Sequence, residues 1–167
     1  MLIVRRTCAS VAAPDAVLQL SFDRRQQPRQ RTSVTSGEEI GLFLERGTVL
    51  HDGDCLLAED GRTVRVVAAS EALVEVHARD GQALARAAYH LGNRHASVEI
   101  ASHVLRFPAD PVLKQLMHTL GFEVREIHAA FEPEPGAYSA GAHAHAGNAR
   151  HAGVIHDFAT RGAQHGK

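Results

Sequence analysis

The sequence contains few of the residues that mark several common protein classes. Its 167 residues include no tryptophan, two tyrosines and two cysteines. Cys8 and Cys55 lie far apart in the chain and form no Cys-x-x-Cys pair, so they indicate neither a disulfide framework nor a zinc ribbon and are typical of a reducing cytosol. No apolar run approaches the roughly 18 residues of a membrane span. We therefore expect a cytoplasmic protein that does not act at a membrane.

An excess of charge of either sign is also missing. The formal net charge is −1, which gives no reason to expect binding to nucleic acid or to an anionic membrane. The one dense basic stretch, residues 24–31, holds four arginines without interleaved aromatic residues, and this argues against stacking on nucleic acid bases. A solvated loop and a surface for an acidic protein partner both remain open for this stretch.

Residues 1–70 consist of short apolar runs separated by glycine-containing turns. Alternating apolar residues predict a strand that ends at Phe22 and another near residues 40–44, and β-branched residues predict a third at residues 63–67. Many short strands of this kind, with turn residues between them, are typical of a small all-β barrel or sandwich. We expect such a domain over residues 1–70.

A different pattern begins near residue 71. The spacing of Leu84, Ala87, Ala88 and Leu91 predicts one buried helical face. Asp80 is a candidate cap at the start of this helix, and Gly92 is expected to end it in the left-handed conformation. A second helix begins after Asp110-Pro111 and is expected to end at Gly121.

Four predicted strands surround these two helices, at residues 73–76, 97–101, 103–107 and 122–127. The order βαββαβ is that of a ferredoxin-like domain, expected over residues 71–138. The whole chain is therefore predicted to be of the α+β class.

Histidine is the residue in excess, with 12 in the chain. His95 falls in the turn that follows the first helix of the second domain, beside Asn93 and Arg94. A turn on a rigid scaffold presents side chains outward, and a neutral imidazole there suits metal ligation or acid–base chemistry. From this residue alone, a histidine that only forms hydrogen bonds within the turn is the favoured interpretation, because most histidines have no special role.

Residues 139–167 are dominated by alanine, glycine and histidine. Such a segment cannot bury enough apolar surface to offset the entropy of ordering it, so we expect a flexible, disordered His-rich tail. Imidazole suits Zn²⁺, Ni²⁺ and Cu²⁺. The irregular spacing favours a native metal-handling tail over an expression tag. The tail histidines are His143, His145, His151, His156 and His165.

The string from His90 to His95, His-Leu-Gly-Asn-Arg-His, together with the preceding residues 84–89, closely resembles the signature of the UreE family, nickel carriers of urease maturation. Residues 36–54 resemble the first domain of that family, and the Phe-Glu-Pro-Glu-Pro-Gly-Ala-Tyr segment at residues 131–138 resembles its last ordered segment. The resemblance covers nearly all of the expected folded chain.

The resemblance implies a nickel metallochaperone without catalysis of its own. His95 would be the central Ni²⁺ ligand, shared across the two-fold axis of a homodimer, and His143 or His145 would complete the shell. Zn²⁺ or Cu²⁺ can occupy the same ligands. The implied partners are the urease apoprotein and the accessory GTPase UreG, and residues 1–70 would bind a peptide or partner surface.

Two other functions remain open on the sequence. A metal-dependent enzyme is one, although His-Glu-x-x-His, Gly-x-Ser-x-Gly and a phosphate-binding glycine loop are missing. A metal-independent binding module with an incidental tail is the other. The remaining histidines receive no metal role; of these, His103 is expected to be partly buried and His118 exposed. They are His51, His77, His90, His103, His118 and His128.

Overall fold

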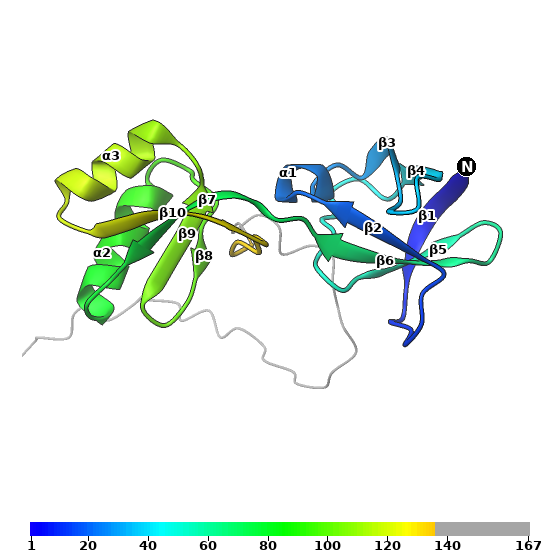
Figure 1. Ribbon diagram of the computed structural model, residues 1–167, viewed down its shortest axis with the longest axis horizontal. Helices are drawn as coiled ribbons and strands as arrows, with labels where there is room; N and C mark the ends of the chain where they lie inside the picture. The colour runs from blue at the N-terminus through cyan, green and yellow to red at the C-terminus, as the bar shows by residue number, and fades with distance from the viewer. Residues whose placement is uncertain (136–167) are drawn as a thin grey trace, which may run out of the picture.

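The computed structural model describes residues 1–135, which form two β-sheets connected in sequence between β6 and β7 (Figure 1). The expected tail at residues 139–167, including His143 and His145, lies outside the described residues. The two sheets, with only short helices, make the fold α+β, as predicted from the sequence. Among residues 1–135 no helix is long and apolar enough to cross a bilayer.

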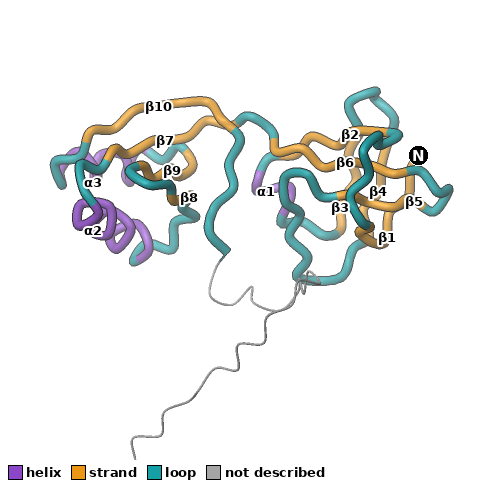
Figure 2. The backbone as a smooth tube through the Cα atoms, turned by 90° about the horizontal axis from the view of Figure 1, so that it is seen from below, coloured by secondary structure: helices purple, strands orange, loops and turns teal. Residues whose placement is uncertain are grey.

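The N-terminal sheet contains six strands in the order β2-β6-β5-β1-β4-β3 (Figure 2). The β1–β4 and β2–β6 pairs are parallel, and the other neighbouring pairs are antiparallel. Alternate residues of these strands form the core, as Val64 and Val66 of β6 do at 0% exposure. The strands are β1 (Leu2–Cys8), β2 (Ala16–Leu20), β3 (Arg29–Ser33), β4 (Glu39–Phe43), β5 (Cys55–Ala58) and β6 (Thr63–Ala68).

The predicted end of the second strand at Phe22 is wrong. The strand β2 ends at Leu20, and Phe22 begins a one-turn helix, α1 (Phe22–Arg25). Arginine has a high helix propensity, and Asp23 carries its negative charge in the first turn, where the helix dipole favours it. Alternation of Leu18, Leu20 and Phe22 therefore indicated a strand that is two residues too long.

The C-terminal sheet contains four antiparallel strands in the order β10-β7-β9-β8. Two helices follow β7 and β9, so the elements run β-α-β-β-α-β along the chain. β8 has two residues instead of the five predicted, because residues 97 and 98 do not pair with β9. The elements are β7 (Glu71–His77), α2 (Gly81–Gly92), β8 (Glu99–Ile100), β9 (Val104–Pro108), α3 (Pro111–Thr119) and β10 (Glu123–Ala129).

Both predicted helix starts are confirmed by their caps. The Asp80 carboxylate accepts a hydrogen bond from the Ala83 N–H at 2.7 Å, and the Asp110 carboxylate accepts from two N–H groups of the first turn of α3 at 2.8 Å. Gly121 follows α3 with φ +84°, as predicted for a glycine after a helix end. The helices bury Ala87, Leu91 and Met117 against Val74, Val76, Leu105 and Phe107 of the sheet.

A fully buried arginine connects the two sheets. Arg25 of α1, at 0% exposure, donates from Nη1 to the Leu50 carbonyl at 3.1 Å and to the Glu132 carboxylate, and from Nη2 to the Phe131 carbonyl. Its guanidinium lies over the Phe22 ring, 5.4 Å from the centroid. Glu132 and Phe131 follow β10, so this contact joins the first domain to the end of the second.

The segment after β10 has partners on both sides. The Glu132 carboxylate also accepts from the Asp52 N–H at 3.0 Å, while the Glu132 N–H donates to Glu99 of β8 at 2.9 Å. Phe131 is buried and makes an edge contact with Phe22, with ring centroids 5.6 Å apart. We call Arg25, Phe131 and Glu132 with these contacts the domain joint.

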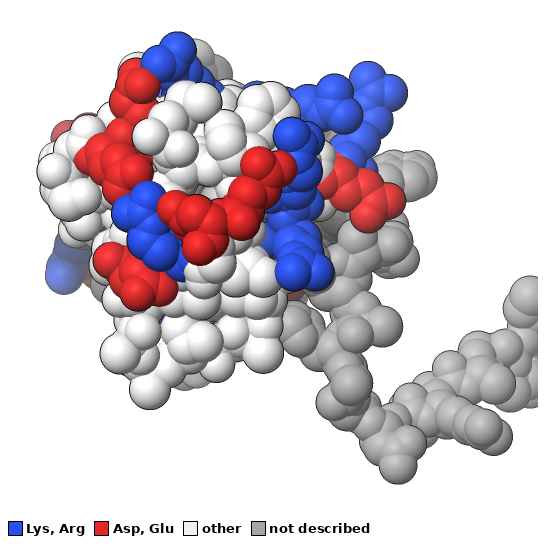
Figure 3. All heavy atoms as spheres, turned by 90° about the vertical axis from the view of Figure 1, so that its right-hand side faces the viewer, with Lys and Arg blue, Asp and Glu red and all other residues white. Residues whose placement is uncertain are grey.

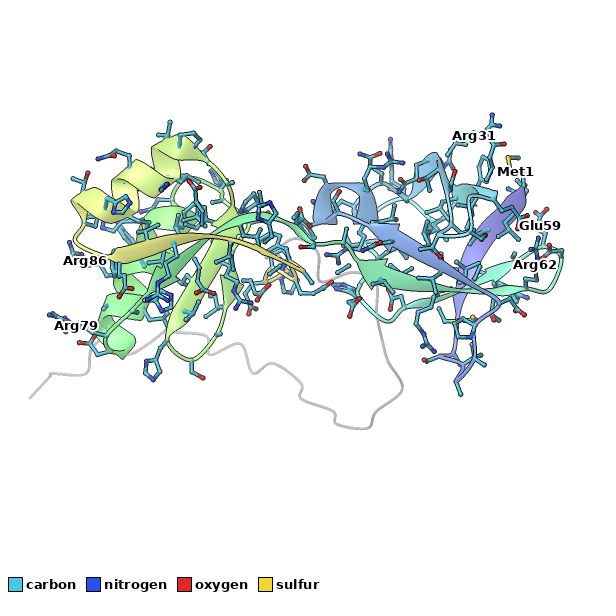
Figure 4. The ribbon with its side chains drawn as sticks, viewed as in Figure 1. Met1, Arg31, Glu59, Arg62, Arg79 and Arg86 are labelled. Carbon is cyan, nitrogen blue, oxygen red and sulfur yellow. The ribbon has the colours of Figure 1, made fainter. Side chains whose placement is uncertain are left out.

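The arginine-rich stretch at residues 24–31 is neither a uniform loop nor a single patch. Arg25 is buried in the domain joint, whereas Arg24 donates to Gln30 at 2.7 Å and Arg31 pairs with Glu39 at 2.6 Å. On the face of the molecule that Figure 3 shows, blue and red side chains alternate. Figure 4 places Met1, Arg31, Glu59 and Arg62 together at the end of the N-terminal domain that lies away from α1.

Candidate metal site

His95 has the one unusual backbone conformation of the C-terminal domain. Within residues 1–135 it is the only residue other than glycine with a left-handed φ, at 54°. A side chain with a Cβ atom resists this conformation, at a cost of about 1–2 kcal/mol. Such strain is found most often where a side chain serves a function.

The sequence placed the left-handed residue three positions too early. Gly92 is the last residue of α2 and continues the right-handed helix, and the turn forms over residues 93–95. The His95 N–H donates to the Gly92 carbonyl at 2.9 Å, and the Ala96 N–H donates to the Leu91 carbonyl at 3.3 Å. These two bonds form a Schellman motif, in which the left-handed position is usually glycine. Here that position is His95.

The motif holds the backbone of His95 while its side chain is left outside. Leu91 is fully buried and Ala96 packs against the same core, so the hydrophobic contact that accompanies a Schellman motif is present. Arg94 donates from its side chain to the His90 carbonyl at 2.9 Å, which covers another free carbonyl of the helix end. The His95 side chain is exposed. The turn therefore presents an imidazole on a fixed backbone.

The chain that follows His95 is anchored by an ionic network. Arg106 of β9 donates to Glu75 of β7 and to Glu99 of β8, each at 2.9 Å. Burial of the Glu75 carboxyl tends to raise its pKa, but the hydrogen bond and charge of Arg106 outweigh burial and hold the pKa below its usual value. Glu75 is therefore ionised at neutral pH and keeps Arg106 in place, and Arg106 in turn holds the short strand β8.

Within the described residues, the imidazole of His95 is not part of a preformed metal site. Among residues 1–135 no group of three or more His, Cys, Asp or Glu side chains is close enough together to hold a metal ion. One imidazole supplies one bond, whereas Ni²⁺ and Zn²⁺ sites in proteins need several ligands. If a metal ion binds at His95, its further protein ligands would come from a second copy of the chain or from residues beyond 135. His143 and His145, which the sequence predicts as ligands, lie outside the described residues.

The remaining histidines are dispersed over the molecule. His103 is exposed, so the prediction that it is partly buried is wrong; it precedes β9 in a turn and does not belong to the inward-facing residues of that strand. His118 is exposed on α3, as predicted. His51 lies at the domain joint, where its Nδ1 is 3.1 Å from the Glu132 carboxylate. Sequence reasoning found no signal for that contact.

Sequence models of known protein domains match both domains of the chain. A sequence model described as the UreE urease accessory protein N-terminal domain matches residues 5–69, and the C-terminal domain model matches residues 71–165. The chain belongs to the UreE family. This is a family of urease accessory proteins and not of enzymes. The second matched region contains His95 and also the two predicted tail ligands.

Individual UreE proteins are similar over most of their length. The urease accessory protein UreE of Azotobacter vinelandii is 45% identical over 165 residues, which cover 96% of this chain and 99% of that protein. The UreE protein of Alkalilimnicola ehrlichii is 48% identical over 138 residues, covering 83% and 85% of the two chains. The UreE protein of Burkholderia vietnamiensis is 48% identical over 136 residues, covering 81% and 68%.

Proposed function

We propose that this protein carries Ni²⁺ and delivers it to urease during maturation of the urease active site. The observation that carries this proposal is the conformation of His95, an exposed imidazole on a left-handed backbone in a UreE-family chain. A strained, outward-facing ligand is more useful for passing on an ion than for building a closed structural site, because structural metal sites are fully coordinated by protein. Ni²⁺ is here a cargo and not a resident cofactor.

The proposed site needs two copies of His95. In a homodimer with a two-fold axis near the α2–β8 turn, one residue of each chain contacts its own symmetry mate. Tyr89 and Ile100 lie on either side of His95 in the chain, and both large side chains are exposed, at 66% and 44%. These apolar groups favour association of this surface with a second copy. Two imidazoles then share one ion.

His143 or His145 is proposed to complete the shell. Both histidines follow residue 135 by only a few residues. The Glu134 N–H donates to the Val98 carbonyl at 2.9 Å, so the chain lies close to β8 shortly before these two positions. Zn²⁺ or Cu²⁺ can compete for the same imidazoles, because both favour nitrogen ligands.

The rest of the architecture fits the same role. We interpret residues 71–138 as a ferredoxin-like metal-binding domain and residues 1–70 as a domain for a peptide or partner surface; the His-rich residues 139–167 lie outside the described residues. The proposed partners are the urease apoprotein and the accessory GTPase UreG, and the proposed location is the cytoplasm. The domain joint holds the partner-binding and metal-binding domains to one another through Arg25.

A transfer experiment tests this function. Full-length protein loaded with radioactive Ni²⁺ is mixed with nickel-free urease apoprotein and the other accessory proteins, and radioactivity and urease activity are followed. We expect Ni²⁺ to move to urease and activity to appear. The double variant His143→Ala/His145→Ala should transfer less nickel, whereas His118→Ala, which removes an exposed histidine on α3, should match the unmodified protein. Nickel that stays bound, or transfer that is equal in all three proteins, would contradict the proposal.

A further inference from the structure

The fold brings together the two cysteines that the sequence keeps far apart. Cys8 is the last residue of β1 and Cys55 the first of β5, and the antiparallel register places the two residues directly opposite each other. The two thiols lie close enough together that Cys55 raises the pKa of Cys8. No other cysteine exists in the chain.

The spacing of opposed residues in a sheet suits a covalent bond. Directly opposed Cα atoms of antiparallel strands lie about 4.5–5.5 Å apart, and disulfides span Cα distances of about 4.4–6.8 Å. A bond between the sulfur atoms of this pair therefore requires rotation of side chains and no displacement of strands.

The pair lies on the face of the sheet opposite the core. Leu56 belongs to the buried core, so Cys55, which precedes it in β5, points to the other face. Arg65 lies opposite Cys55 on β6, and its guanidinium donates to the Val11 carbonyl, which holds the chain after Cys8 across this face. Cys55 is 4% exposed under this covering, while Cys8 is partly exposed. A small molecule can therefore reach the Cys8 thiol, whereas the Cys55 thiol is covered.

We propose that Cys8 and Cys55 form a reversible disulfide across β1 and β5. A low-molecular-weight disulfide such as oxidised glutathione is the oxidant. The Cys8 sulfur, after losing its proton, attacks one sulfur of the small disulfide and releases a thiolate. The Cys55 sulfur, after losing its proton, then attacks Cys8 and releases the second thiolate. The protein loses two protons and two electrons, and the oxidant takes up both to become two thiols.

The reduced state is protected at neutral pH. Desolvation raises the pKa of Cys8 to about 11, and the hydrogen bond and charge of Cys55 act in the same direction. Arg6 on the same strand acts in the opposite direction, and Arg65 faces Cys55 from β6. Because the thiolate is the attacking form, bond formation below pH 11 should accelerate roughly tenfold with each unit of pH until Cys55 or the oxidant limits the rate.

The bond would have a measurable effect on the first domain. β5 and β1 are the two middle strands of the six-stranded sheet, and the chain between the cysteines includes β2, α1, β3 and β4. Closing so long a loop restrains the unfolded chain, so the thermal midpoint of the oxidised protein should rise by on the order of 10 °C.

The test uses full-length folded protein incubated with oxidised glutathione at pH 8, with free thiols counted in denaturant and the intact mass measured. We expect loss of both thiols, a mass lower by two hydrogens, a joined peptide pair in the digest, and recovery of both thiols with dithiothreitol. Circular dichroism before and after oxidation checks that the native fold is kept.

Two variants separate the steps. Cys55→Ser should retain glutathione on Cys8, because the second thiol is missing, and Cys55→Ala serves if that protein does not fold. Cys8→Ser should leave Cys55 unmodified and should show no change of thermal midpoint. Wild-type protein that keeps both thiols, that retains glutathione on Cys8, or that forms the bond only when unfolded would overturn the proposal.

Discussion

The His95 turn and the domain joint use polar side chains in opposite ways. At the domain joint, Arg25 is fully buried, and both of its terminal nitrogens donate hydrogen bonds to Leu50, Phe131 and Glu132. At the turn, His95 is exposed and its backbone takes a conformation that its Cβ disfavours. The polar groups of the domain joint hold the two domains together, whereas the His95 turn leaves an imidazole free to bind a ligand.

This difference separates structural from functional polar residues. A charge that is buried must be paired, and removing its partner is strongly destabilising. A strained, exposed residue contributes little to stability, so a role in the proposed metal binding is the explanation we favour for a histidine at this position. Within one chain, the cost of a substitution should therefore be large at the domain joint and small or negative at His95.

The largest effect is expected for Arg25→Met. The substitution keeps most of the side-chain volume, but it removes the donor to the Phe131 and Leu50 carbonyls and one of the donors to the Glu132 carboxylate, which keeps the Asp52 N–H. Breaking a buried pair costs about 3–5 kcal/mol, and the 35% exposure of Glu132 moves the expected loss towards the lower end of that range. Urea denaturation followed by circular dichroism should show this loss of unfolding free energy. A loss below about 1 kcal/mol would mean that the domain joint is not a structural contact of the kind described.

An intermediate effect with a defined pH dependence is expected for Glu75→Gln. The amide cannot accept from Arg106 as a carboxylate does, and a hydrogen bond to a charged group contributes about 1.5–3 kcal/mol, which partial exposure of Arg106 reduces. The pKa of Glu75 is lowered in the folded protein, so its contribution is present above the unfolded-state pKa of about 4.3 and is lost as pH falls through the folded pKa.

The check on Glu75 is a comparison of unfolding free energies at two pH values. Wild type should be more stable than Glu75→Gln at pH 7, and the difference should shrink as the pH is lowered towards 3, because proton uptake removes the charge that pairs with Arg106. A difference that stays constant from pH 7 to pH 3 would show that the ionised form of Glu75 is not what stabilises β7, β8 and β9.

A smaller effect of opposite sign is expected at His95. Glycine takes left-handed φ without a Cβ penalty, so His95→Gly should be more stable than His95→Ala by about 1 kcal/mol. The matched control is Gly121→Ala, which introduces a Cβ at φ +84° with no atom within 4 Å of it, and should cost about the same amount. Thermal melting of the wild type and of these three variants measures the differences in stability. His95→Ala as stable as His95→Gly would contradict the strain at this turn.

The smallest effect is expected for Arg31→Ala. Arg31 comes from the same arginine-rich stretch as Arg25, but its pair with Glu39 is exposed, at 68% and 53% for the two side chains. Exposed pairs contribute little because water and salt screen them. Urea denaturation should show no measurable change in the free energy of unfolding, and a change as large as that of Arg25→Met would remove the distinction between the two arginines.

Sequence reasoning recovered what depends on local chemistry. The caps Asp80 and Asp110 and the left-handed Gly121 were predictable because each acts within a few residues of its helix. The position of His95 in a turn was predictable from the helical stripe before it. That the left-handed residue is His95 and not Gly92 was not predictable from propensity, since glycine is the usual residue there.

What the sequence did not reveal depends on long-range register and packing. Arg25 belongs to the same arginine-rich stretch as the exposed Arg29 and Arg31, and Arg25 is buried because Phe131 and Glu132 dock against it. Cys8 and Cys55 meet because β1 pairs with β5, which spacing along the chain cannot indicate. The partners of His51 and Glu132 depend on the same tertiary contacts.

The most direct test of the central claim is calorimetric titration of Ni²⁺ into His95→Gly, beside the unmodified protein. Glycine removes the imidazole and also relieves the strained backbone, so a misfolded turn cannot explain a loss of binding. We predict one tightly bound Ni²⁺ per two chains in the unmodified protein and no tight site in His95→Gly, with dimer mass unchanged and thermal stability equal or higher. A His95→Gly dimer that still binds one Ni²⁺ with the original affinity would contradict the claim.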